Sequence, residues 1–525
     1  MRPHQRSTLP LQELSRRTVP DLLDRARQFG LDRPILIATS GGAALTYGAF
    51  LERVSGASCA LRERFAPGSR IACMLGNSTD YLIIRYALSC AGLVEVAING
   101  QHRDAVLCRM LAATAPSAVI VADADRDHLL ACGHDLGRTD LIGEESLAAI
   151  ASIKAPWESR PSPDIHPEDP CRILFTSGTS GWSKAVELSH GYEVFTGQRH
   201  VDLLDIGTED RWLYVTPLFH IDAIYIFSIL LHTGGAFVLA PRFSASRFWT
   251  DVQRSGATYL CYVGSILPIL LKGGDAPPLP RGGDSPRGHP LRMAVGGGTT
   301  REQLDRFERR FDVTVLESFA MTECIACTFN TAEDRRLGSV GRQVPGYEVA
   351  ILDGSDTPCP PGTAGEIAVR TREPCGLFTR YVGDPAATAS AMRGGWCHTG
   401  DLGTRDDDGY FYYLGRIKDA IRVRGENVSA IELESIADQH PDVAASAAVA
   451  VPAELGEDDI LLYVELKPDR APDARALFDH IAARAPRFMV PHYLRFMERL
   501  PRTATEKVQK STLPRTVDSQ CVVRG

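Results

Sequence analysis

Short apolar runs alternate with longer stretches of mixed polarity along the N-terminal part of the chain. The runs at residues 34–39, 69–75 and 92–98 have the length and apolar character of buried strands. Two helical stretches surround the first of these runs within residues 21–64, and an amphipathic helix is predicted over residues 81–90. Strands and helices that alternate at this spacing indicate βαβ units and a largely parallel sheet.

The same alternation returns over residues 212–239 and 258–295, and the pattern changes after the acidic turn at residues 406–409. Beyond that turn, a helix, two strands and a second helix are predicted at residues 427–440, 444–452, 460–468 and 474–485. They form an α+β unit of about one hundred residues, which is an ordinary domain size. We therefore predict an N-terminal domain over residues 1–414 and a C-terminal domain over residues 415–525.

The composition is that of a soluble globular protein, with 44% hydrophobic and 23% charged residues. The net charge is −8 and no long basic run is present, which argues against nucleic acid or an anionic membrane surface as the main partner. The most apolar stretch, residues 221–240, is interrupted by Asp222, Ser228 and His232. We therefore interpret it as buried secondary structure and expect no membrane span and no signal peptide.

The thirteen cysteines are scattered and odd in number, which favours reduced thiols and a cytoplasmic location over a disulfide framework. Cys324 and Cys327 form a CxxC pair, which leaves open a zinc or redox site. The sequence supplies no second CxxC and no neighbouring histidine to complete such a site. We therefore interpret both cysteines as small apolar residues of the core.

A run rich in hydroxyl side chains and glycine, residues 175–184, has the composition of a phosphate-binding loop. Glycines let the backbone approach an anion, hydroxyls add neutral hydrogen-bond donors, and a lysine adds a charge. The residues concerned are Thr176, Ser177, Gly178, Thr179, Ser180, Gly181 and Lys184. The order differs from a Walker-type loop, because Lys184 does not directly follow a glycine.

Eight motifs occur in a fixed order along the chain. They are FTSGTSGWSKAV (175–186), PLFH (217–220), ESFAMTE (317–323), GSVGRQVPG (338–346), GEIAVR (365–370), WCHTGDLG (396–403), GRIKDAIRVRGENVSAIELE (415–434) and PRTATEKVQK (501–510). This set strongly resembles the adenylate-forming superfamily of acyl-CoA synthetases, peptide-synthetase adenylation domains and luciferases, over almost the whole chain. The resemblance implies an α/β fold, with a large N-terminal region of stacked mixed and parallel sheets, helices and a distorted barrel. A small mobile α+β domain follows at the C-terminus.

The resemblance also implies a two-step reaction that uses ATP, Mg²⁺ and coenzyme A on a small-molecule carboxylic acid. In the family, the acid attacks the α-phosphate of ATP, pyrophosphate leaves, and a thiol then displaces AMP. Chemistry of this kind depends on positioning and on charge neutralisation more than on covalent catalysis by the protein. The thiol belongs to coenzyme A or to the pantetheine of a carrier protein, and the sequence leaves both open.

Four residues occupy the family's catalytic positions. Thr322 is expected to contact the α-phosphate, and Glu323 is expected to hold Mg²⁺ through a hard carboxylate oxygen. Lys507 is expected to stabilise the charge that develops at the α-phosphate and the carboxylate. His220 stands at the position of a gate on the acyl pocket, although a single histidine is also a common residue of a core.

The remaining nucleotide contacts that the resemblance implies lie in several motifs. The hydroxyl- and glycine-rich loop holds the β- and γ-phosphates, and Lys184 closes that loop or guides pyrophosphate out. Asp401 accepts hydrogen bonds from the ribose hydroxyls, and Arg416 lies near the ribose and phosphates. Phe319 stacks on adenine, and Gly297 belongs to the same ATP site.

The C-terminal domain of the family rotates between the two half-reactions about a hinge in the GRxKD motif, here Lys418. Hinges of this kind are a few residues that absorb a change in φ and ψ. Gly425 would allow a pantetheine arm to pass closely. Arg422 and Arg424 are candidate contacts for the phosphates of coenzyme A.

Within the family the chain looks most like the carnitine/crotonobetaine-type acyl-CoA ligases, judged by PLFHID, YVGSILPILL and LRMAVGGG. The expected acyl pocket comprises Ile221, Asp222, Tyr225, Tyr262, Val263, Gly296, Gly298 and Ala320, behind His220. Asp222 either pairs with an amino or quaternary ammonium group of the substrate or caps the following helix, and the cap is slightly favoured. Phe219 replaces the aspartate that anchors an α-amino group in peptide synthetases, which favours a stand-alone ligase.

Three departures from the family pattern leave alternatives open. The first motif has Ser183-Lys184-Ala185 where Pro-Lys-Gly is usual, Phe319-Ala320 replaces Tyr-Gly, and Glu506 stands where many members carry glycine. The leading hypothesis is an AMP-forming acid–thiol ligase. A second hypothesis is an adenylating enzyme that passes the activated group to an amine or a carrier protein, including nitrite activation for diazotisation. A third is an inactive homologue with a binding or regulatory role.

Overall fold

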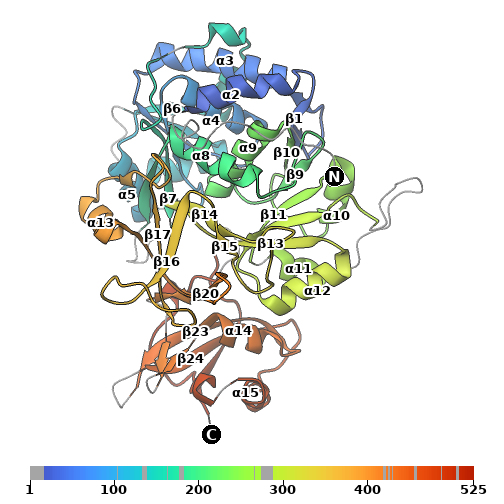
Figure 1. The fold of residues 1–525 in the computed structure, drawn as a ribbon, viewed down its shortest axis with the longest axis vertical. Helices are drawn as coiled ribbons and strands as arrows, with labels where there is room; N and C mark the ends of the chain where they lie inside the picture. Colours follow the sequence, from blue (N-terminus) through green and yellow to red (C-terminus); the bar gives the residue numbers. More distant parts are fainter. Residues whose placement is uncertain are drawn as a thin grey trace. The chain divides into compact units, whose positions relative to one another are not determined.

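The computed structural model describes residues 17–102, 104–132, 139–161, 163–176, 183–264, 266–273, 288–417, 421–423, 426–428, 430–453, 458–485, 487–503 and 508–524 (Figure 1). The chain forms two compact units. The first comprises Met1–Val349 and Val369–Cys397, and the second comprises Ala350–Ala368 and His398–Gly525. The domain boundary at about residue 415 stays a prediction.

A seven-stranded sheet of the first unit has the order β18-β8-β7-β4-β3-β5-β6. Its strands are β3 Arg70–Met74, β4 Val94–Ala97, β5 Ala118–Val121, β6 Asp140–Ile142, β7 Pro170–Thr176, β8 Lys184–Ser189 and β18 Arg380–Tyr381. The five strands from β6 to β7 run parallel, whereas β8 and β18 are added in antiparallel orientation. The prediction of a largely parallel sheet is therefore confirmed.

A nine-stranded sheet, also in the first unit, has the order β15-β14-β13-β12-β11-β9-β10-β1-β2. Its strands are β1 Pro34–Ala38, β2 Leu45–Thr46, β9 Arg211–Tyr214, β10 Ala236–Leu239, β11 Tyr259–Val263, β12 Met293–Gly297, β13 Thr314–Met321, β14 Cys324–Phe329 and β15 Arg342–Gln343. The strands from β13 to β1 are parallel neighbours, and each end of the sheet carries antiparallel strands.

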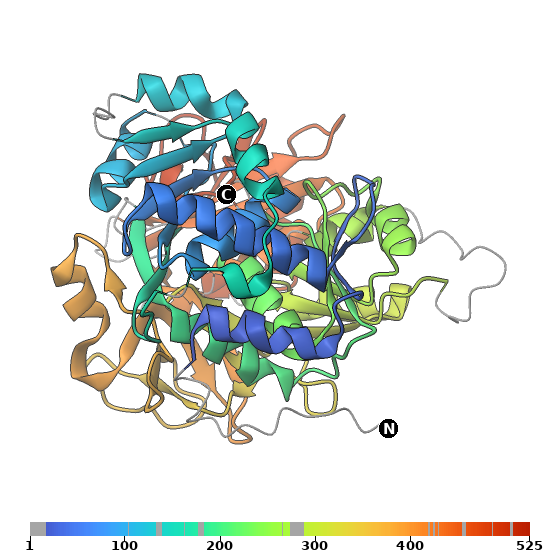
Figure 2. The ribbon, with the colours of Figure 1, turned by 90° about the horizontal axis from the view of Figure 1, so that it is seen from above.

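Helices cover both sheets of the first unit. They are α2 Val19–Ala26, α3 Tyr47–Arg64, α4 Thr79–Cys90, α5 Asp104–Thr114, α6 Arg126–Ala131, α7 Glu144–Ser152, α8 His190–Val201, α9 Ile221–Thr233, α10 Phe248–Ser255, α11 Ile266–Lys272, α12 Arg301–Phe311 and α13 Pro385–Ala391. Helices α2 and α3 are drawn in blue in Figure 2. Helix α2 packs against α4, α8 and α9, and helix α3 packs against α4 and α7. Apolar side chains of α10, α11 and α12 pack with those of β9, β11 and β13 in one core cluster.

Helix α4 differs from the amphipathic helix that the sequence predicted. Every residue from Tyr81 to Cys90 is buried, because α3 and α7 pack on the helix as well as the sheet. The charged residue of this stretch, Arg85, pairs with buried Glu95 at 2.9 Å between Nε and Oε2. Arg172 Nη1 lies 2.9 Å from the same oxygen, so two arginine side chains offset the charge of the buried carboxylate.

The apolar stretch at residues 221–240 forms α9 and β10, as the sequence predicted for buried secondary structure. Gly234 ends the helix with a positive φ of 78°, and a Cβ there would meet Phe29 Cγ at 2.6 Å. Only glycine therefore allows this close turn between α9 and β10. In the part of the chain that the structure describes, no helix is long and apolar enough to span a membrane.

The remaining strands form three smaller sheets. One has the order β16-β17-β19-β20, with β16 Tyr347–Leu352, β17 Gly365–Thr371, β19 Cys397–Arg405 and β20 Phe411–Arg416. A hairpin pairs β21 Ile421–Val423 with β22 Glu426–Val428. The third sheet has the order β23-β24-β25-β26, with β23 Val443–Pro452, β24 Asp458–Leu466, β25 Tyr493–Met497 and β26 Val522–Val523.

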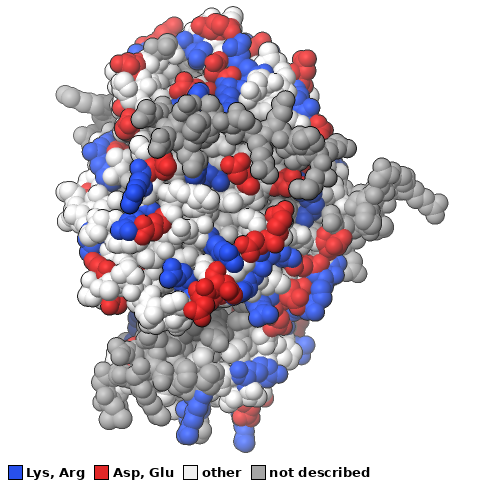
Figure 3. All heavy atoms as spheres, in the orientation of Figure 1, with Lys and Arg blue, Asp and Glu red and all other residues white. Residues whose placement is uncertain are grey.

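Helices α14 Ala430–Asp438 and α15 Ala474–Ala482 pack on this third sheet through one apolar cluster. The predicted α+β unit is thus confirmed, but its first helix begins later than residue 427 because β22 occupies residues 426–428. On the face drawn in Figure 3, described basic and acidic side chains are interspersed.

Candidate functional site

The Thr322-Glu323 turn joins β13 to β14, with Met321 and Cys324 as the flanking register pair. The hydroxyl of buried Tyr192 on α8 donates to the Thr322 carbonyl oxygen at 3.0 Å. The same hydroxyl accepts from the Ile325 amide at 2.9 Å. Both backbone arms of the turn are therefore fixed by one side chain, which gives Thr322 and Glu323 a defined position.

Glu323 is 4% exposed and is held by β18 and by the segment that leads into it. Tyr381 Oη donates to Glu323 Oε1 at 2.6 Å, and the Phe378 amide donates to the Glu323 carbonyl oxygen at 2.9 Å. Burial, together with the neighbouring carboxylate, raises the pKa of Tyr381 well above its ordinary value. The phenol therefore remains a protonated donor at neutral pH.

A single carboxylate is a fitting ligand for Mg²⁺, which binds enzymes through one or two carboxylates together with substrate phosphates. Among the described residues, no group of three or more His, Cys, Asp or Glu side chains could hold a metal ion by itself. The hard oxygen of Glu323, in a turn held on both arms, suits a cation that is also bound by nucleotide phosphates. This role of Glu323 stays a prediction.

The two ends of the predicted phosphate loop meet at one end of the β7–β8 pair in the seven-stranded sheet. Thr176, the last residue of β7, is the register partner of Lys184, the first residue of β8. Lys184 Nζ lies 4.3 Å from the centre of the Tyr381 ring, so a cation–π contact brings the loop base to the Glu323 turn. The loop residues Ser177, Gly178, Thr179, Ser180 and Gly181 lie outside the described residues.

Two glycines at the end of β12, Gly296 and Gly297, leave no space for side chains. A Cβ at Gly296 would lie 2.0 Å from the Tyr262 carbonyl oxygen, and one at Gly297 would lie 2.8 Å from the Ser318 carbonyl oxygen. Gly298 has a positive φ of 87°. The backbones of β11, β12 and β13 therefore approach closely where the sequence placed part of the ATP and acyl sites.

Phe319 and Ala320 follow on β13 with opposite exposure. The Phe319 side chain is 6% exposed, and Ala320 is exposed, as expected for neighbours that alternate across a strand. Stacking of Phe319 on adenine stays a prediction.

Glu317 belongs to the ESFAMTE motif, but sequence reasoning gave it no role. It is 5% exposed, and its Oε1 accepts a hydrogen bond from the Thr299 amide at 3.2 Å. Burial raises the pKa of Glu317 to about 8, so that its carboxyl is largely protonated at neutral pH. The signal that could have found it is a single charged residue in a strand that carries no other charge.

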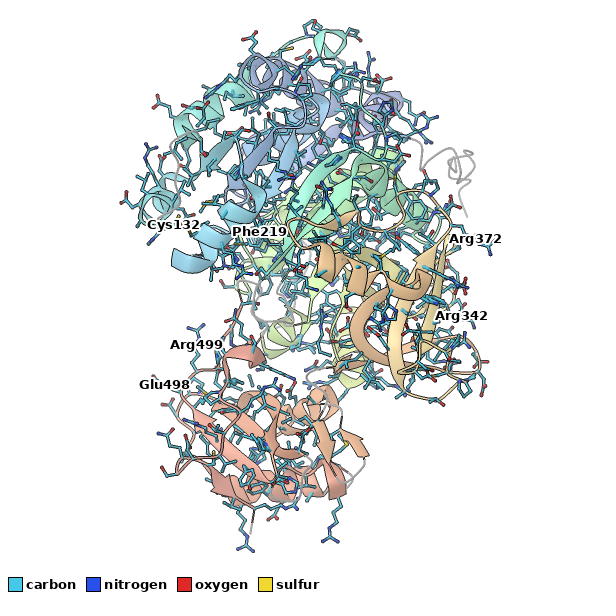
Figure 4. All side chains as sticks on the ribbon, turned by 90° about the vertical axis from the view of Figure 1, so that its left-hand side faces the viewer. Cys132, Phe219, Arg342, Arg372, Glu498 and Arg499 are labelled. Carbon is cyan, nitrogen blue, oxygen red and sulfur yellow. The ribbon has the colours of Figure 1, made fainter. Side chains whose placement is uncertain are left out.

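His220 stands at the N-terminus of α9, in extended backbone conformation and half-buried. Its ring lies 4.7 Å from that of Phe219, which is labelled in Figure 4. Because His220 is the capping residue and Asp222 lies within the first turn, the slightly favoured interpretation of Asp222 as the helix cap was wrong. A carboxylate in a first turn still interacts favourably with the helix dipole.

The strand-to-helix connection that carries His220 is held by residues that sequence reasoning missed. Asn77 Nδ2 donates to the Thr216 carbonyl oxygen at 2.9 Å, and the Leu218 amide donates to Asn77 Oδ1 at 2.8 Å. Arg85 Nη2 donates to the Leu218 carbonyl oxygen at 2.7 Å. The PLFH motif is therefore anchored to α4 and to the turn before it.

The other predicted pocket residues line the end of the nine-stranded sheet and the start of α9. Tyr225 and Tyr262 are 5% and 1% exposed, whereas Ile221, Asp222 and Val263 are half-buried. Burial, together with the Asp222 carboxylate, raises the pKa of Tyr225 well above its ordinary value. The nearby Asp222 charge shows that this region is not purely apolar, and the assignment of the pocket stays a prediction.

In the second unit, Asp401 on β19 is the register partner of Arg416 on β20. Asp401 is 2% exposed, and Arg416 Nε lies 2.9 Å from its Oδ1. Glu366 accepts hydrogen bonds from the Gly400 amide and from His398 Nδ1, both at 2.8 Å. The GEIAVR motif thus holds the strand formed by the WCHTGDLG motif in place.

Several predicted residues cannot be placed in this geometry. Lys418, Arg424, Gly425 and Lys507 lie outside the described residues, and only the backbone of Arg422 is described, on β21. Their roles stay predictions.

The CxxC cysteines are buried on β14. Hydrogen bonds with the thiols of Cys327 and Cys397, together with burial, raise the pKa of the Cys324 thiol well above its ordinary value. A neutral, buried thiol is a poor nucleophile, as the interpretation of a core residue requires.

Comparisons with known proteins identify the class. The sequence model of the AMP-binding enzyme family matches residues 22–382, and that of the AMP-binding enzyme C-terminal domain matches residues 432–507. The chain therefore belongs to the AMP-binding enzyme family, which confirms the resemblance to adenylate-forming enzymes.

Individual relatives agree with this assignment. The chain is 32% identical to the sulfoacetate–CoA ligase of Cupriavidus necator over 521 residues, covering 95% of this chain and 99% of that protein. It is 30% identical to the crotonobetaine/carnitine–CoA ligase of Escherichia coli O45:K1 over 465 residues, covering 85% and 88%. Its fold matches the crystal structure of ATP-bound MatB from Rhodopseudomonas palustris with a TM-score of 0.82, at 25% identity and over 94% and 98% of the two chains. The predicted fold class is thereby confirmed.

Proposed function

We propose that this chain uses ATP to convert a carboxylic acid into an acyl-adenylate and then transfers the acyl group to coenzyme A. The observation that carries the proposal is the contact chain from Lys184 through Tyr381 to Glu323. It joins the base of a hydroxyl-rich, glycine-rich loop to the turn that is predicted to hold a nucleotide-bound cation. Relatives that are named as CoA ligases support the same reading.

The first half-reaction forms a bond between a carboxylate oxygen of the acid and the α-phosphorus of ATP. The bond from that phosphorus to the bridging oxygen breaks, and pyrophosphate leaves. Thr322 supplies a hydroxyl donor and Lys507 supplies a positive charge where negative charge develops. Glu323 would hold Mg²⁺ together with the nucleotide, and the ion would supply positive charge that offsets the charge of the phosphates.

Asp401 is proposed to orient the nucleotide through its ribose. An aspartate carboxylate accepts hydrogen bonds through two oxygens, which matches the two hydroxyl donors of a ribose. Arg416 places a positive charge 2.9 Å from this buried carboxylate and so offsets part of the cost of its burial.

In the second half-reaction, the sulfur of coenzyme A attacks the acyl carbon and AMP leaves with the bonding electrons. The thiol proton is lost to solvent or to a base. Arg422, Arg424 and Gly425 are proposed to guide the phosphates and the pantetheine arm, and Lys418 is proposed as the hinge between the two steps.

Sequence similarity does not identify the acid substrate. Relatives with about the same sequence identity to this chain are named as CoA ligases for different acids, sulfoacetate in one case and crotonobetaine or carnitine in another. The acyl region combines buried tyrosines with Asp222 and His220. We therefore expect an acid with a polar group beyond its carboxylate to be a better substrate than a plain alkyl acid of equal length.

Release of pyrophosphate and AMP across a panel of acids, with and without coenzyme A, tests this function. The panel spans short, medium and long fatty acids, aryl acids, betaines, sulfoacetate, amino acids, and nitrite with an aminobenzoate. We expect one class of carboxylate to give AMP that rises sharply with coenzyme A. Turnover that needs an amine and ignores coenzyme A would contradict the thiol step, and no release with any acid would contradict the adenylation step.

A further inference from the structure

Tyr381 contacts two predicted site residues that are far from it in the sequence. Its hydroxyl donates to Glu323 Oε1 at 2.6 Å, and its ring centre lies 4.3 Å from Lys184 Nζ. Both Tyr381 and Glu323 are 4% exposed, so their hydrogen bond lies in a region of low dielectric, where it is strengthened. No motif drawn from the sequence gave Tyr381 a role.

The backbone and ring of Tyr381 are held independently of this hydroxyl. Tyr381 is the register partner of Val186 in the β18–β8 pair, and its amide donates to Thr388 Oγ1 at 3.0 Å. The Phe378 ring packs against the Tyr381 ring with centres 4.8 Å apart. Removal of the hydroxyl alone would leave all of these contacts in place, so its role is separable from that of the fold.

We propose that Tyr381 is a positioning residue for adenylation, which orients the Glu323 carboxylate toward Mg²⁺–ATP and holds the Lys184 ammonium at the base of the phosphate loop. The inference rests on the proposed function, because it takes Glu323 as the carboxylate that meets the cation. A hydrogen bond to one carboxylate oxygen fixes the plane of the group. Loss of such a partner typically lowers metal affinity or activity by about 10- to 100-fold.

The two contacts of Tyr381 can be separated by substitution. A Tyr381→Phe variant loses the bond to Glu323 but keeps an aromatic face for Lys184. A Tyr381→Leu variant loses both. If Tyr381 has a structural role only, the two variants should differ in stability and in nothing else. If it is a positioning residue, both variants should bind the metal ion poorly, and Tyr381→Leu should in addition bind ATP poorly.

The experiment compares the full-length wild type with Tyr381→Phe, Tyr381→Leu and a matched control, Tyr259→Phe. Tyr259 is a fully buried tyrosine of the same unit, and its hydroxyl donates to the Asp205 carbonyl oxygen at 2.7 Å. Two readouts are used. The first is the affinity of Mn²⁺ in the presence of saturating ATP, measured by electron paramagnetic resonance without acid or coenzyme A. The second is the Mg²⁺ dependence of acid-dependent AMP formation.

Tyr381→Phe is expected to weaken Mn²⁺ binding about 10-fold and to raise the Mg²⁺ concentration for half-maximal rate by a similar factor. Its KM for the acid is expected to stay at the wild-type value. Tyr381→Leu is expected to show the same metal defect and, in addition, a raised KM for ATP at saturating Mg²⁺. Tyr259→Phe is expected to match the wild type in both readouts.

An unchanged metal response in Tyr381→Phe would overturn the inference, and so would an equal defect in Tyr259→Phe. A wild type that forms no AMP with any acid would contradict the proposed function instead. The Mn²⁺ measurement needs no turnover, so the comparison between wild type and variants decides the inference in that case as well.

Discussion

Arg416 Nε lies 2.9 Å from Asp401 Oδ1, across a register pair of β19 and β20. The pair is asymmetric, because Asp401 is 2% exposed while the Arg416 side chain is 36% exposed. A buried carboxylate thus faces a cation that reaches solvent. A buried carboxylate beside a cation suits an acceptor for ribose hydroxyls, because its charge is offset within the protein.

Replacement of Asp401 by alanine is expected to raise the KM for ATP by about 10- to 100-fold, because hydrogen bonds to charged groups contribute about 1.5–3 kcal/mol. Steady-state kinetics with ATP and with 3′-deoxy-ATP measure the effect, and the variant should discriminate less between the two nucleotides. The matched control is Asp406→Ala, which removes a carboxylate that accepts from Tyr412 Oη on the same pair of strands. Equal KM values for the two variants would contradict the ribose role.

Replacement of Tyr192 by phenylalanine is expected to loosen the Thr322-Glu323 turn. The Thr322 carbonyl and the Ile325 amide both lose their partner, and an unsatisfied buried group costs about 1–3 kcal/mol. We expect a lower free energy of unfolding together with a fall in kcat for adenylation. Tyr47→Phe is the control, since its buried hydroxyl donates to the Gly235 carbonyl oxygen at 2.9 Å. If Tyr47→Phe is destabilised to the same extent and shows an equal fall in kcat, the claim that Tyr192 acts by fixing the Thr322-Glu323 turn is contradicted.

The raised pKa of Glu317, about 8, predicts a pH-dependent stability. The folded protein keeps this proton between pH 4.5 and 8, whereas the unfolded chain has lost it, so stability falls as pH rises through that window. The contribution changes by up to about 1.4 kcal/mol per pH unit. Glu317→Gln should therefore gain stability relative to the wild type as pH rises. Urea unfolding of both proteins between pH 5 and 8 measures the difference, and a constant difference would show that Glu317 is ionised when folded.

Replacement of Gly296 by alanine is expected to displace the ends of β11 and β12, because the new Cβ would lie 2.0 Å from the Tyr262 carbonyl oxygen. Overpacking of this kind typically costs about 1–3 kcal/mol. Thermal unfolding and ATP binding by calorimetry should both weaken. Gly76→Ala is the control, since no atom lies within 4 Å of a Cβ at that glycine. An unchanged ATP affinity in Gly296→Ala would contradict a nucleotide site at the ends of β11 and β12.

The sequence predicted the elements well where local pattern decides them. The runs at residues 34–39 and 69–75 became β1 and β3, because short apolar segments bounded by polar residues fit buried strands. Helix α4 was predicted to be amphipathic, but it is buried from Tyr81 to Cys90, and Arg85 pairs with Glu95 inside the protein. A buried ion pair cannot be recognised from the periodicity of either partner.

The candidate site was predicted through its motifs, and the residues that hold the motifs in place were missed. Tyr381 lies 58 positions from Glu323, and Asn77 lies 141 positions from Leu218. Such contacts arise only when strands from distant parts of the chain pair, so no local pattern carries them. Glu317 was missed for a different reason, since its raised pKa depends on burial that the motif alone does not reveal.

Transfer of oxygen from the acid to AMP tests the central claim most directly. A carboxylic acid labelled with ¹⁸O in both carboxylate oxygens is turned over with ATP and coenzyme A, and the AMP is analysed by mass spectrometry. Attack of the carboxylate on the α-phosphate predicts AMP that carries one ¹⁸O atom, together with an acyl-CoA that retains the other. Unlabelled AMP, or label in inorganic phosphate, would contradict formation of an acyl-adenylate.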